Sequence, residues 1–248
     1  MTEKIGILGG MGSAAGLYFA QQLIALNTAA RQDGDHVPFI LYSDPHIPNR
    51  VDAYLNRTAN PAPHVVTSLQ KLAALGADFG VVICNTAHIY FDEIESHVKM
   101  PLINMVENTA DHIDTCFPTA SVGLLATTAT VKSGLYSRHF DRMGRTLATP
   151  DDDDQALLMA AIFDTEFGIK ATGNVPSMKA IDSIIEVAGR MRQRAGVTHL
   201  LLGCTELSFA IQGQKWANFH IIDPVKVLAQ HCLERVASAQ TEVFSIAA

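Results

Sequence analysis

Two short stretches of this 248-residue chain each carry a cysteine where an apolar run turns polar. Residues 81–88 contain Cys84, and residues 200–207 contain Cys204. This pattern is typical of a buried strand that delivers a thiol to the loop at its C-terminal end. If one sulfur is a thiolate and the other a thiol, the pair can serve as general base and general acid. Two such groups on opposite walls of a cleft suit the inversion of a carbon stereocentre.

A single cysteine at the end of a buried strand is more often a small, inert hydrophobic residue than a catalyst. Cys84 and Cys204 are favoured as reactive groups because they occupy matched positions of an internal repeat. Cys116 and Cys232 have no such counterparts and are predicted to be structural.

Two titratable residues stand close to these cysteines in the sequence. His88 suggests a cysteine–histidine nucleophilic pair with Cys84, but a supporting role at a helix start is favoured because no orienting third residue is evident. Glu206, if it is ionised and close to Cys204, would raise the pKa of that thiol. Its alternative role is to bind backbone or a partner loop.

The repeat is visible in spacings rather than in residue identities. Gly6 lies 78 residues before Cys84, and Gly123 lies 81 residues before Cys204. A glycine also stands eight residues before each cysteine. We therefore predict an α/β fold made of two pseudo-symmetric halves, each with a parallel sheet.

The elements that position the cysteines follow from alternating apolar and polar segments. Strands are predicted at residues 5–8, 38–42, 79–83, 101–104, 122–125, 146–149, 198–203 and 220–223. Helices are predicted at residues 14–30, 64–75, from Cys84 to about 98, 107–115, 151–167, 176–194 and from 224 onward. Residues 46–63 are predicted to form a long loop that carries Arg50 and Arg57, and residues 168–174 a turn. In parallel sheets, ligands bind off the C-terminal strand ends, where both cysteines are expected.

Composition excludes several function classes. The chain is 48% hydrophobic and 17% charged, with a formal net charge of −7 and no block of basic residues, so it lacks the electrostatic footprint for nucleic acid or an anionic membrane. No signal-like or membrane-spanning segment is evident. Four scattered cysteines without a Cys-x-x-Cys motif predict neither a disulfide framework nor a zinc site. We expect a reduced, cytoplasmic protein with a small-molecule partner.

The glycine-rich turn at residues 9–12 leaves a third class of function open. Together with Gly16 it imitates a dinucleotide-binding fingerprint, which is a weak signal by itself. An NAD(P)-binding oxidoreductase, or a ligand-binding protein without catalysis, is therefore an alternative. The fingerprint explains neither cysteine.

Taken together, the motifs resemble those of the cofactor-independent aspartate/glutamate racemase superfamily, and most closely its aspartate racemase branch. The resemblance is carried by Ile5-Gly6-Ile7-Leu8-Gly9-Gly10-Met11-Gly12, Cys84-Asn85-Thr86-Ala87-His88, Leu124-Leu125-Ala126-Thr127-Thr128 and Gly203-Cys204-Thr205-Glu206. Their order and spacing cover nearly the whole chain.

The resemblance implies that Cys84 and Cys204 are the paired acid and base, with no cofactor and no metal. It implies that the substrate is surrounded by Met11, Asn85, Thr86, Thr127, Thr128, Thr130 and Thr205. Arg50, in a segment similar to the branch's Ile-Pro-Asp-Arg, would be a carboxylate fork, and Lys170 a second cation. Asn49 replaces the usual acid of that segment, and Ala129 replaces the commoner glycine.

The resemblance further implies the boundaries of the two domains and the reaction of the protein. Residues 1–105 plus 224–248 would form one domain and residues 106–223 the other, with the active site in the cleft between them, and the protein would be a homodimer. The expected reaction is racemisation of an acidic amino acid, aspartate ahead of glutamate. The asymmetry between Asn85-Thr86 and Thr205-Glu206 keeps open a one-cysteine dicarboxylate isomerase or decarboxylase.

Overall fold

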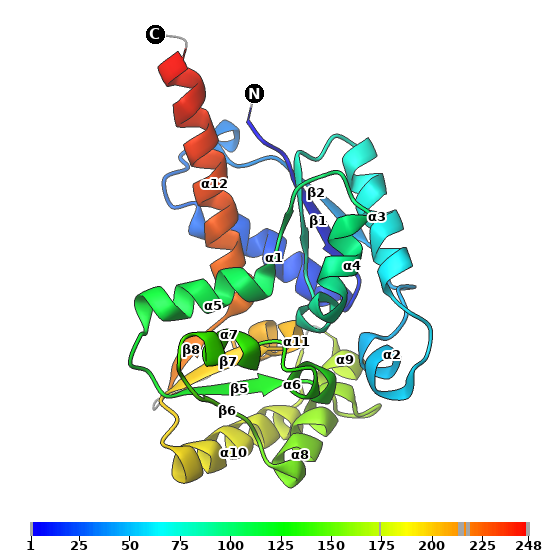
Figure 1. Cartoon of the computed structure of the whole chain (residues 1–248), viewed down its shortest axis with the longest axis vertical. Coiled ribbons are helices and arrows are strands. Elements are labelled where there is room, and N and C mark those ends of the chain that lie inside the picture. Colours follow the sequence, from blue (N-terminus) through cyan, green and yellow to red (C-terminus); the bar gives the residue numbers. More distant parts are fainter. Residues whose placement is uncertain (1, 174, 213–215, 217–218, 247–248) are drawn as a thin grey trace.

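Two parallel sheets with the same strand order form the framework of the molecule (Figure 1). The computed structural model describes residues 2–173, 175–212, 216 and 219–246. The first sheet has the order β2-β1-β3-β4, and its strands are β1 (Ile5–Gly9), β2 (Phe39–Ser43), β3 (Phe79–Val82) and β4 (Leu102–Ile103). The second has the order β6-β5-β7-β8, with β5 (Val122–Ala126), β6 (Leu147–Ala148), β7 (His199–Gly203) and β8 (His220–Ile222). The predicted α/β fold with a repeated plan is confirmed.

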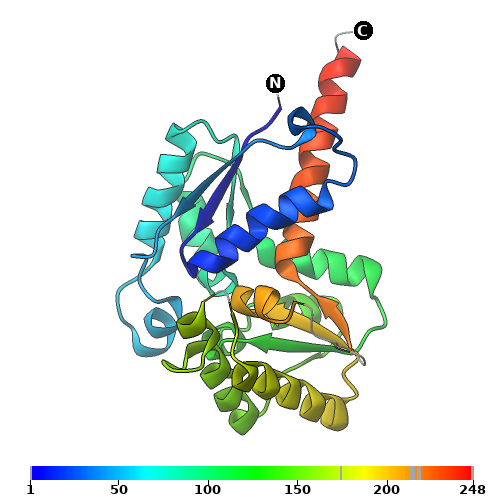
Figure 2. The ribbon, with the colours of Figure 1, turned by 180° about the vertical axis from the view of Figure 1, so that it is seen from behind.

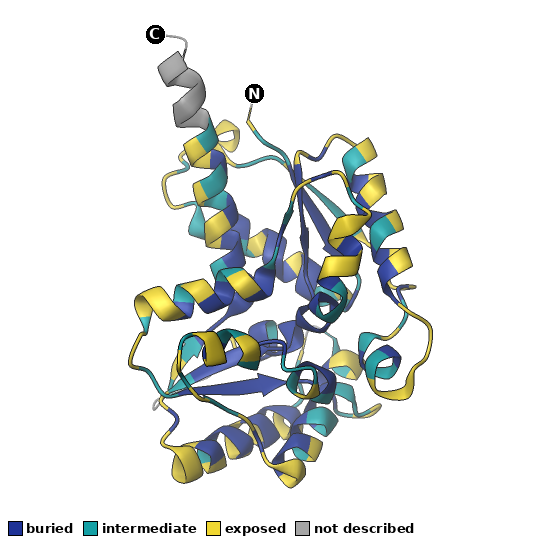
Figure 3. Cartoon of the chain, viewed as in Figure 1, coloured by how far each residue is buried: buried dark blue, intermediate teal, exposed yellow. Residues whose placement is uncertain are grey.

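Helices cover both sheets, which explains why the central strands are almost continuously apolar. In the first half of the chain they are α1 (Ser13–Leu26), α2 (Arg50–Asn56), α3 (Ala62–Ala74), α4 (Phe91–Ser96) and α5 (Met105–Cys116). The remaining helices are α6 (Thr128–Lys132), α7 (Ser137–Arg142), α8 (Asp152–Phe163), α9 (Ile169–Thr172), α10 (Met178–Ala195), α11 (Thr205–Ala210) and α12 (Pro224–Ile246). Short 3₁₀ turns lie at Asp33–Asp35 and Asn85–Tyr90. Figure 3 shows buried strands enclosed by helices whose outer faces are exposed.

Two segments expected to lack helices contain short ones. Within the predicted loop 46–63, α2 begins after Asn49, whose side-chain oxygen accepts a hydrogen bond from the Val51 N–H at 2.9 Å. Within the predicted turn 168–174, α9 covers Ile169–Thr172, and residue 174 lies outside the described residues. Both helices are too brief to show a clear apolar period.

The segment after Cys84 differs from its prediction as well. A single helix was expected to continue to about residue 98, but a 3₁₀ turn at Asn85–Tyr90 precedes α4. The turn carries the buried residues Asn85, Thr86 and His88 inward immediately after the cysteine.

The last helix packs on the first sheet although it follows the second in sequence. Val225, Leu228 and Cys232 of α12 are fully buried in a core shared with Ile5 and Phe79 of the first sheet. α12 also packs against α1 and α5, and both ribbon views show it crossing α1 (Figures 1 and 2). Within the described residues, no helix is both long enough and apolar enough to cross a membrane.

Candidate active site

The two cysteines lie at equivalent places in the two sheets and line one cavity. Cys84 follows the end of β3 and begins the 3₁₀ turn, and Cys204 follows β7 and begins α11. Each side chain is only 5% exposed, and neither cysteine is in a disulfide. The cavity between them is narrow, about 20 Å³, which is room for about one water molecule. Its walls must therefore separate for an amino acid to enter.

Most of the residues predicted around the substrate line this cavity with the cysteines. They are Met11, Arg50, Asn85, Thr86, Thr127, Lys170 and Thr205. Two predicted residues are not among the described residues that line it. Thr130 is fully buried, and the backbone N–H of Thr128 is directed to Met159 Sδ at 3.3 Å.

Three threonine hydroxyls join the two halves beside the cavity. Thr86 Oγ1 lies 3.1 Å from Thr127 Oγ1 and 3.0 Å from Thr130 Oγ1, and the latter two are 3.1 Å apart. Each hydroxyl can both donate and accept, so the ring of contacts satisfies all three. Thr130 thus supports the two lining threonines from behind.

Asn85 directs an unpaired donor into the cavity wall. Its Oδ1 accepts a hydrogen bond from the Tyr136 hydroxyl, which fixes the orientation of the amide. Its Nδ2 is buried and has no acceptor among the described residues. A buried donor without a partner costs about 1–3 kcal/mol, so this position is suited to an acceptor group on a ligand.

Arg50 supplies a second unpaired donor. Its Nη2 donates to the Met11 carbonyl at 2.8 Å, and its Nη1 donates to the carbonyls of Ile47 and Pro48 at 3.2 and 3.1 Å. Within the described part of the chain, its buried Nε finds no acceptor. Together with Asn85 Nδ2, Arg50 Nε makes the cavity suitable for an acceptor-rich, anionic ligand.

Glu206 connects one cysteine to the two halves of the molecule. Its Oε2 accepts a hydrogen bond from Cys204 Sγ at 3.1 Å. Its Oε1 accepts from the Gly12 N–H at 2.9 Å and forms an ion pair with Lys170. Lys170 also reaches the Met11 carbonyl at 3.4 Å.

The charges of this cluster shift the pKa values of its members. Burial opposes ionisation of Glu206, but Lys170 outweighs it and lowers the pKa of the carboxyl. Burial likewise opposes the charge of Lys170, and Glu206 nevertheless raises the pKa of that ammonium. Burial and the neighbouring Glu206 raise the pKa of Cys204 well above its usual value, although Lys170 acts in the opposite direction.

His88 supports the backbone of Cys84 rather than its sulfur. Its Nε2 accepts the Met105 N–H at 3.2 Å, so Nδ1 carries the proton and donates to the Cys84 carbonyl at 2.9 Å. Burial lowers the pKa of His88 to about 4, and the ring stacks on Phe91. A neutral imidazole that positions the cysteine loop accounts for these contacts.

Three further residues belong to the site, although no sequence motif predicted them. Tyr136 holds Asn85, Phe163 lines the cavity beneath Lys170 with its ring centre 5.6 Å from Nζ, and Val51 also lines it. They come from α2, α8 and the start of α7, and nothing in their local patterns distinguishes them from ordinary core residues.

Other protein groups occupy the space around the glycine turn that follows β1, at residues 9–12. Gly10 has φ +97°, and any side chain there would overlap the Asp44 backbone. A Cβ on Gly12 would lie 2.9 Å from Glu206 Oε1, and the Gly12 N–H already binds that oxygen. In this structure the turn therefore receives Glu206 where a dinucleotide fingerprint would receive a phosphate.

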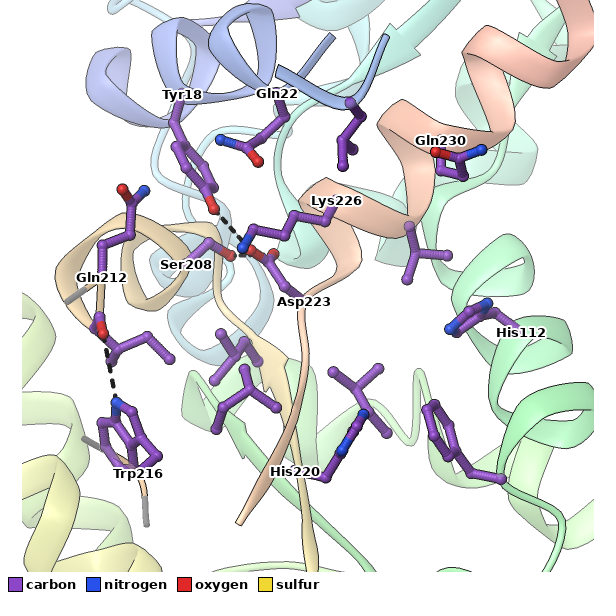
Figure 4. A pocket seen from close by; sticks show the side chains of 17 residues that line it. Tyr18, Gln22, His112, Ser208, Gln212, Trp216, His220, Asp223, Lys226 and Gln230 are labelled. Carbon is purple, nitrogen blue, oxygen red and sulfur yellow. Dashed lines mark hydrogen bonds between the residues drawn. The ribbon is translucent and has the colours of Figure 1, made fainter. Parts of the chain in front are cut away.

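A larger cavity lies elsewhere and contains neither Cys84 nor Cys204. It measures about 630 Å³ and is bordered by α1, α5, α11, β8 and α12 (Figure 4). Asp223 on its wall accepts hydrogen bonds from Tyr18 at 3.0 Å, Ser208 at 2.7 Å and the Val225 N–H at 2.9 Å. These bonds connect three helices, so we interpret Asp223 as a structural joint.

The chain is similar to known proteins over most of its length. A sequence model of the Asp/Glu/hydantoin racemase family matches residues 8–232. A broad specificity amino-acid racemase, RacX of Bacillus subtilis, is 30% identical over 169 residues, which cover 64% of this chain and 70% of the relative.

Solved structures share the same architecture. An aspartate racemase from Picrophilus torridus is similar with a TM-score of 0.82 and 32% identity, covering 95% of this chain and 94% of that one. A glutamate racemase from Francisella tularensis, solved with D-glutamate, has a TM-score of 0.68 and 16% identity, covering 96% and 82% of the two chains. At that identity the second similarity concerns the fold alone.

Proposed function

The chain belongs to the Asp/Glu/hydantoin racemase family and is an enzyme of the racemase class, and from this premise we propose that it racemises an acidic amino acid with Cys84 and Cys204 as acid and base. The observation that carries the proposal is that two cysteines from equivalent strand ends line one cavity. Aspartate is the proposed substrate, with glutamate as the second candidate.

The chemistry consists of two proton transfers at one carbon. A thiolate on one wall removes the proton from Cα, and the thiol on the opposite wall delivers a proton to the other face. The carbon is inverted, one cysteine has gained a proton, and the other has lost one. Both transfers use side chains of the protein, so the scheme requires no prosthetic group.

The charge that develops during the reaction needs fixed donors. When the Cα proton leaves, negative charge spreads into the α-carboxylate, where preorganised hydrogen-bond donors stabilise it most effectively. Asn85 Nδ2 is the donor we assign to that group. The hydroxyls of Thr86 and Thr205 would join it by turning from the protein groups that they contact here, the other two threonines and Glu206 Oε2. Thr127 holds Thr86 in place through their shared hydrogen bond.

Preference for an acidic substrate is assigned to two cations. Arg50 Nε and Lys170 Nζ border the same cavity, and a second carboxylate would provide acceptors for both. The similarity to an aspartate racemase structure supports aspartate as the substrate. The similarity to a broad specificity racemase makes neutral amino acids the necessary comparison.

Replacement of each cysteine tests the proposal. Cys84→Ala and Cys204→Ala should each lower kcat for aspartate racemisation by about 100- to 10,000-fold, the usual contribution of a general acid or base. Cys116→Ala, at an exposed cysteine, should leave kcat unchanged. In deuterated water, wild-type enzyme should place deuterium at Cα whichever enantiomer is supplied.

Three other outcomes would count against the proposal. Full racemisation by either single-cysteine variant would contradict the two-base scheme. Turnover of maleate or a malonate by one of those variants would favour a one-cysteine isomerase or decarboxylase. Binding of NAD(P) at millimolar concentration would favour the alternative of an NAD(P)-binding oxidoreductase.

The cysteine thiols also bear on the cellular compartment of the protein. Because the proposed catalytic groups are free thiols, we infer a reducing compartment, the cytoplasm. Assembly as a homodimer stays a prediction from the family resemblance.

A further inference from the structure

The two cysteines differ in one contact that bears on which of them carries the proton. Cys204 Sγ lies 3.1 Å from Glu206 Oε2, in the geometry of a thiol that donates to a carboxylate. Among the described residues, no carboxylate makes such a contact with Cys84 Sγ. The repeat therefore places the thiols symmetrically but surrounds them differently.

Glu206 is held in its ionised form from the side opposite the cysteine. Lys170 of α9 and the Gly12 N–H both bind Oε1. Oε2 accepts from Cys204 Sγ at 3.1 Å and from the Thr205 hydroxyl at 3.4 Å. Burial and the nearby carboxylate favour the neutral thiol, and the pKa of Cys204 is raised accordingly. An ionised Cys204 would instead place two negative charges side by side.

We propose that Glu206 is a positioning residue that keeps the proton on Cys204 in the ligand-free enzyme. This inference rests on the proposed two-base racemisation. That reaction needs one thiol and one thiolate, so Cys84 is the thiolate in the competent resting form. For the enantiomer whose Cα proton faces Cys84, Cys84 removes that proton and Cys204 delivers its own to the opposite face. The other enantiomer reacts with the form in which the proton has moved from Cys204 to Cys84.

The same cluster accounts for the return to the resting form. After the transfer, Cys84 is a thiol and Cys204 is a thiolate that faces the Glu206 carboxylate. Their repulsion favours the return of a proton to Cys204, and Lys170 limits that repulsion so that the transfer can occur at all. The charged groups that face Cys204 are Glu206 of α11 and Lys170 of α9, with Arg50 of α2 and Cys84 also on the cavity wall.

Comparing the rates of the two enantiomers cannot test this assignment. Enantiomers are equally stable in water, so their kcat/KM values must be equal whichever cysteine rests as the thiol. The protonation of each sulfur has to be measured directly. Alkylation by iodoacetamide provides this measurement because only the thiolate reacts.

The experiment follows alkylation of Cys84 and Cys204 separately, by peptide mass spectrometry, across a range of pH in ligand-free enzyme. In the wild type, the midpoint for Cys204 should lie above that for Cys84, because Glu206 accepts a hydrogen bond from Cys204 alone of the two sulfurs in the described structure. Glu206→Gln removes the negative charge and leaves Lys170 unopposed, so the Cys204 midpoint should fall by about one unit or more. The alkaline limb of the pH profile of kcat/KM should move in the same direction. Glu95→Gln, at an exposed carboxyl of α4, is the matched control and should change neither.

Each possible result decides the matter. A Cys204 midpoint at or below that of Cys84, or one that Glu206→Gln leaves in place, overturns the inference. If that variant does not fold, Glu206→Asp keeps the charge but shortens the side chain, and it should give a smaller fall in the Cys204 midpoint. If Cys84→Ala and Cys204→Ala both abolish racemisation while the midpoints contradict the prediction, only the role of Glu206 fails. If neither replacement affects racemisation, the proposed function itself fails.

Discussion

Arg50 gives three of its five N–H groups to backbone carbonyls, whereas the family resemblance implies a carboxylate fork. Both terminal nitrogens are engaged by backbone carbonyls, including the Met11 carbonyl at 2.8 Å. Among the described residues, Nε has no acceptor, and Nη2 has a second N–H beyond the one that it donates to Met11. The guanidinium therefore has two tasks, to hold the glycine turn and to present its remaining N–H groups, Nε among them, to a ligand.

Substitution of Arg50 should raise the KM for acidic substrates but not the KM for neutral ones. Arg50→Lys removes the Nε donor, and a hydrogen bond to a charged group contributes about 1.5–3 kcal/mol. The KM for aspartate should therefore rise by roughly 10- to 100-fold. Steady-state assays of aspartate and of a neutral amino acid provide the measurement.

The control for this prediction is Arg57→Lys, at the end of the same helix, which should change neither KM. Arg57 closes α2 and does not line the cavity in the described structure. An equal rise in KM for aspartate and for the neutral amino acid would show that Arg50 has no role in reading the second carboxylate.

At the scale of elements, the turn between β1 and α1 connects the proposed catalytic groups of both halves. It presents the Met11 carbonyl to Arg50 and Lys170, and it presents the Gly12 N–H to Glu206. Gly10 makes the turn possible because it adopts φ +97° against the Asp44 backbone. The position of Glu206 thus depends on a backbone conformation that other residues rarely adopt.

A methyl group at Gly10 should destabilise the protein more than one at another glycine with positive φ. Gly10→Ala combines the cost of positive φ with overlap of the Asp44 backbone, and we expect a loss of about 2–4 kcal/mol in unfolding free energy. Gly196→Ala, at φ +63° with open space around it, should cost about 1–2 kcal/mol. Urea unfolding of both variants measures the difference. Equal losses would mean that the turn relaxes without strain.

At the scale of the whole molecule, α12 determines how the chain divides. Its buried residues share a core with β1, β3 and α1 of the first half, although it follows the last strand of the second sheet. It also packs against α5 and α11 of the second half. We propose on this ground that residues 1–105 and 224–248 form one domain and residues 106–223 the other. The cavity with the two cysteines would then lie between two bodies whose relative movement admits the substrate.

A cavity made in α12 should weaken the first domain selectively. Leu228 is fully buried in the first core, and Leu228→Ala should cost about 2–5 kcal/mol. Hydrogen exchange in low denaturant should show β1 and β3 losing more protection than β5 and β7. Gln230→Ala, at an exposed position of the same helix, is the control. Equal loss of protection in both sheets would contradict the proposed division.

Much of the architecture could be predicted from the sequence because strand and helix patterns are local. The apolar runs before Cys84 and Cys204 predict β3 and β7, and the matched spacings predict that the two sheets share one plan. The short helices α2 and α9 escaped prediction because a helix of one or two turns has too few residues for a period to be recognised. Their side chains Arg50 and Lys170 were found through the family resemblance instead.

The long-range contacts around the cysteines were decided by tertiary structure. Glu206 binds a backbone amide 194 residues away and a lysine 36 residues away, and Tyr136 holds Asn85 across 51 residues. No local pattern encodes such pairs, because they depend on how separate elements pack. The sequence by itself determined a repeated α/β fold with a cysteine at each matched strand end. The sequence also places Glu206 two residues after Cys204. Only the packing of separate elements brought Lys170 and the Gly12 N–H to that carboxylate, and with Oε2 turned to Cys204 the two similar thiols have different environments.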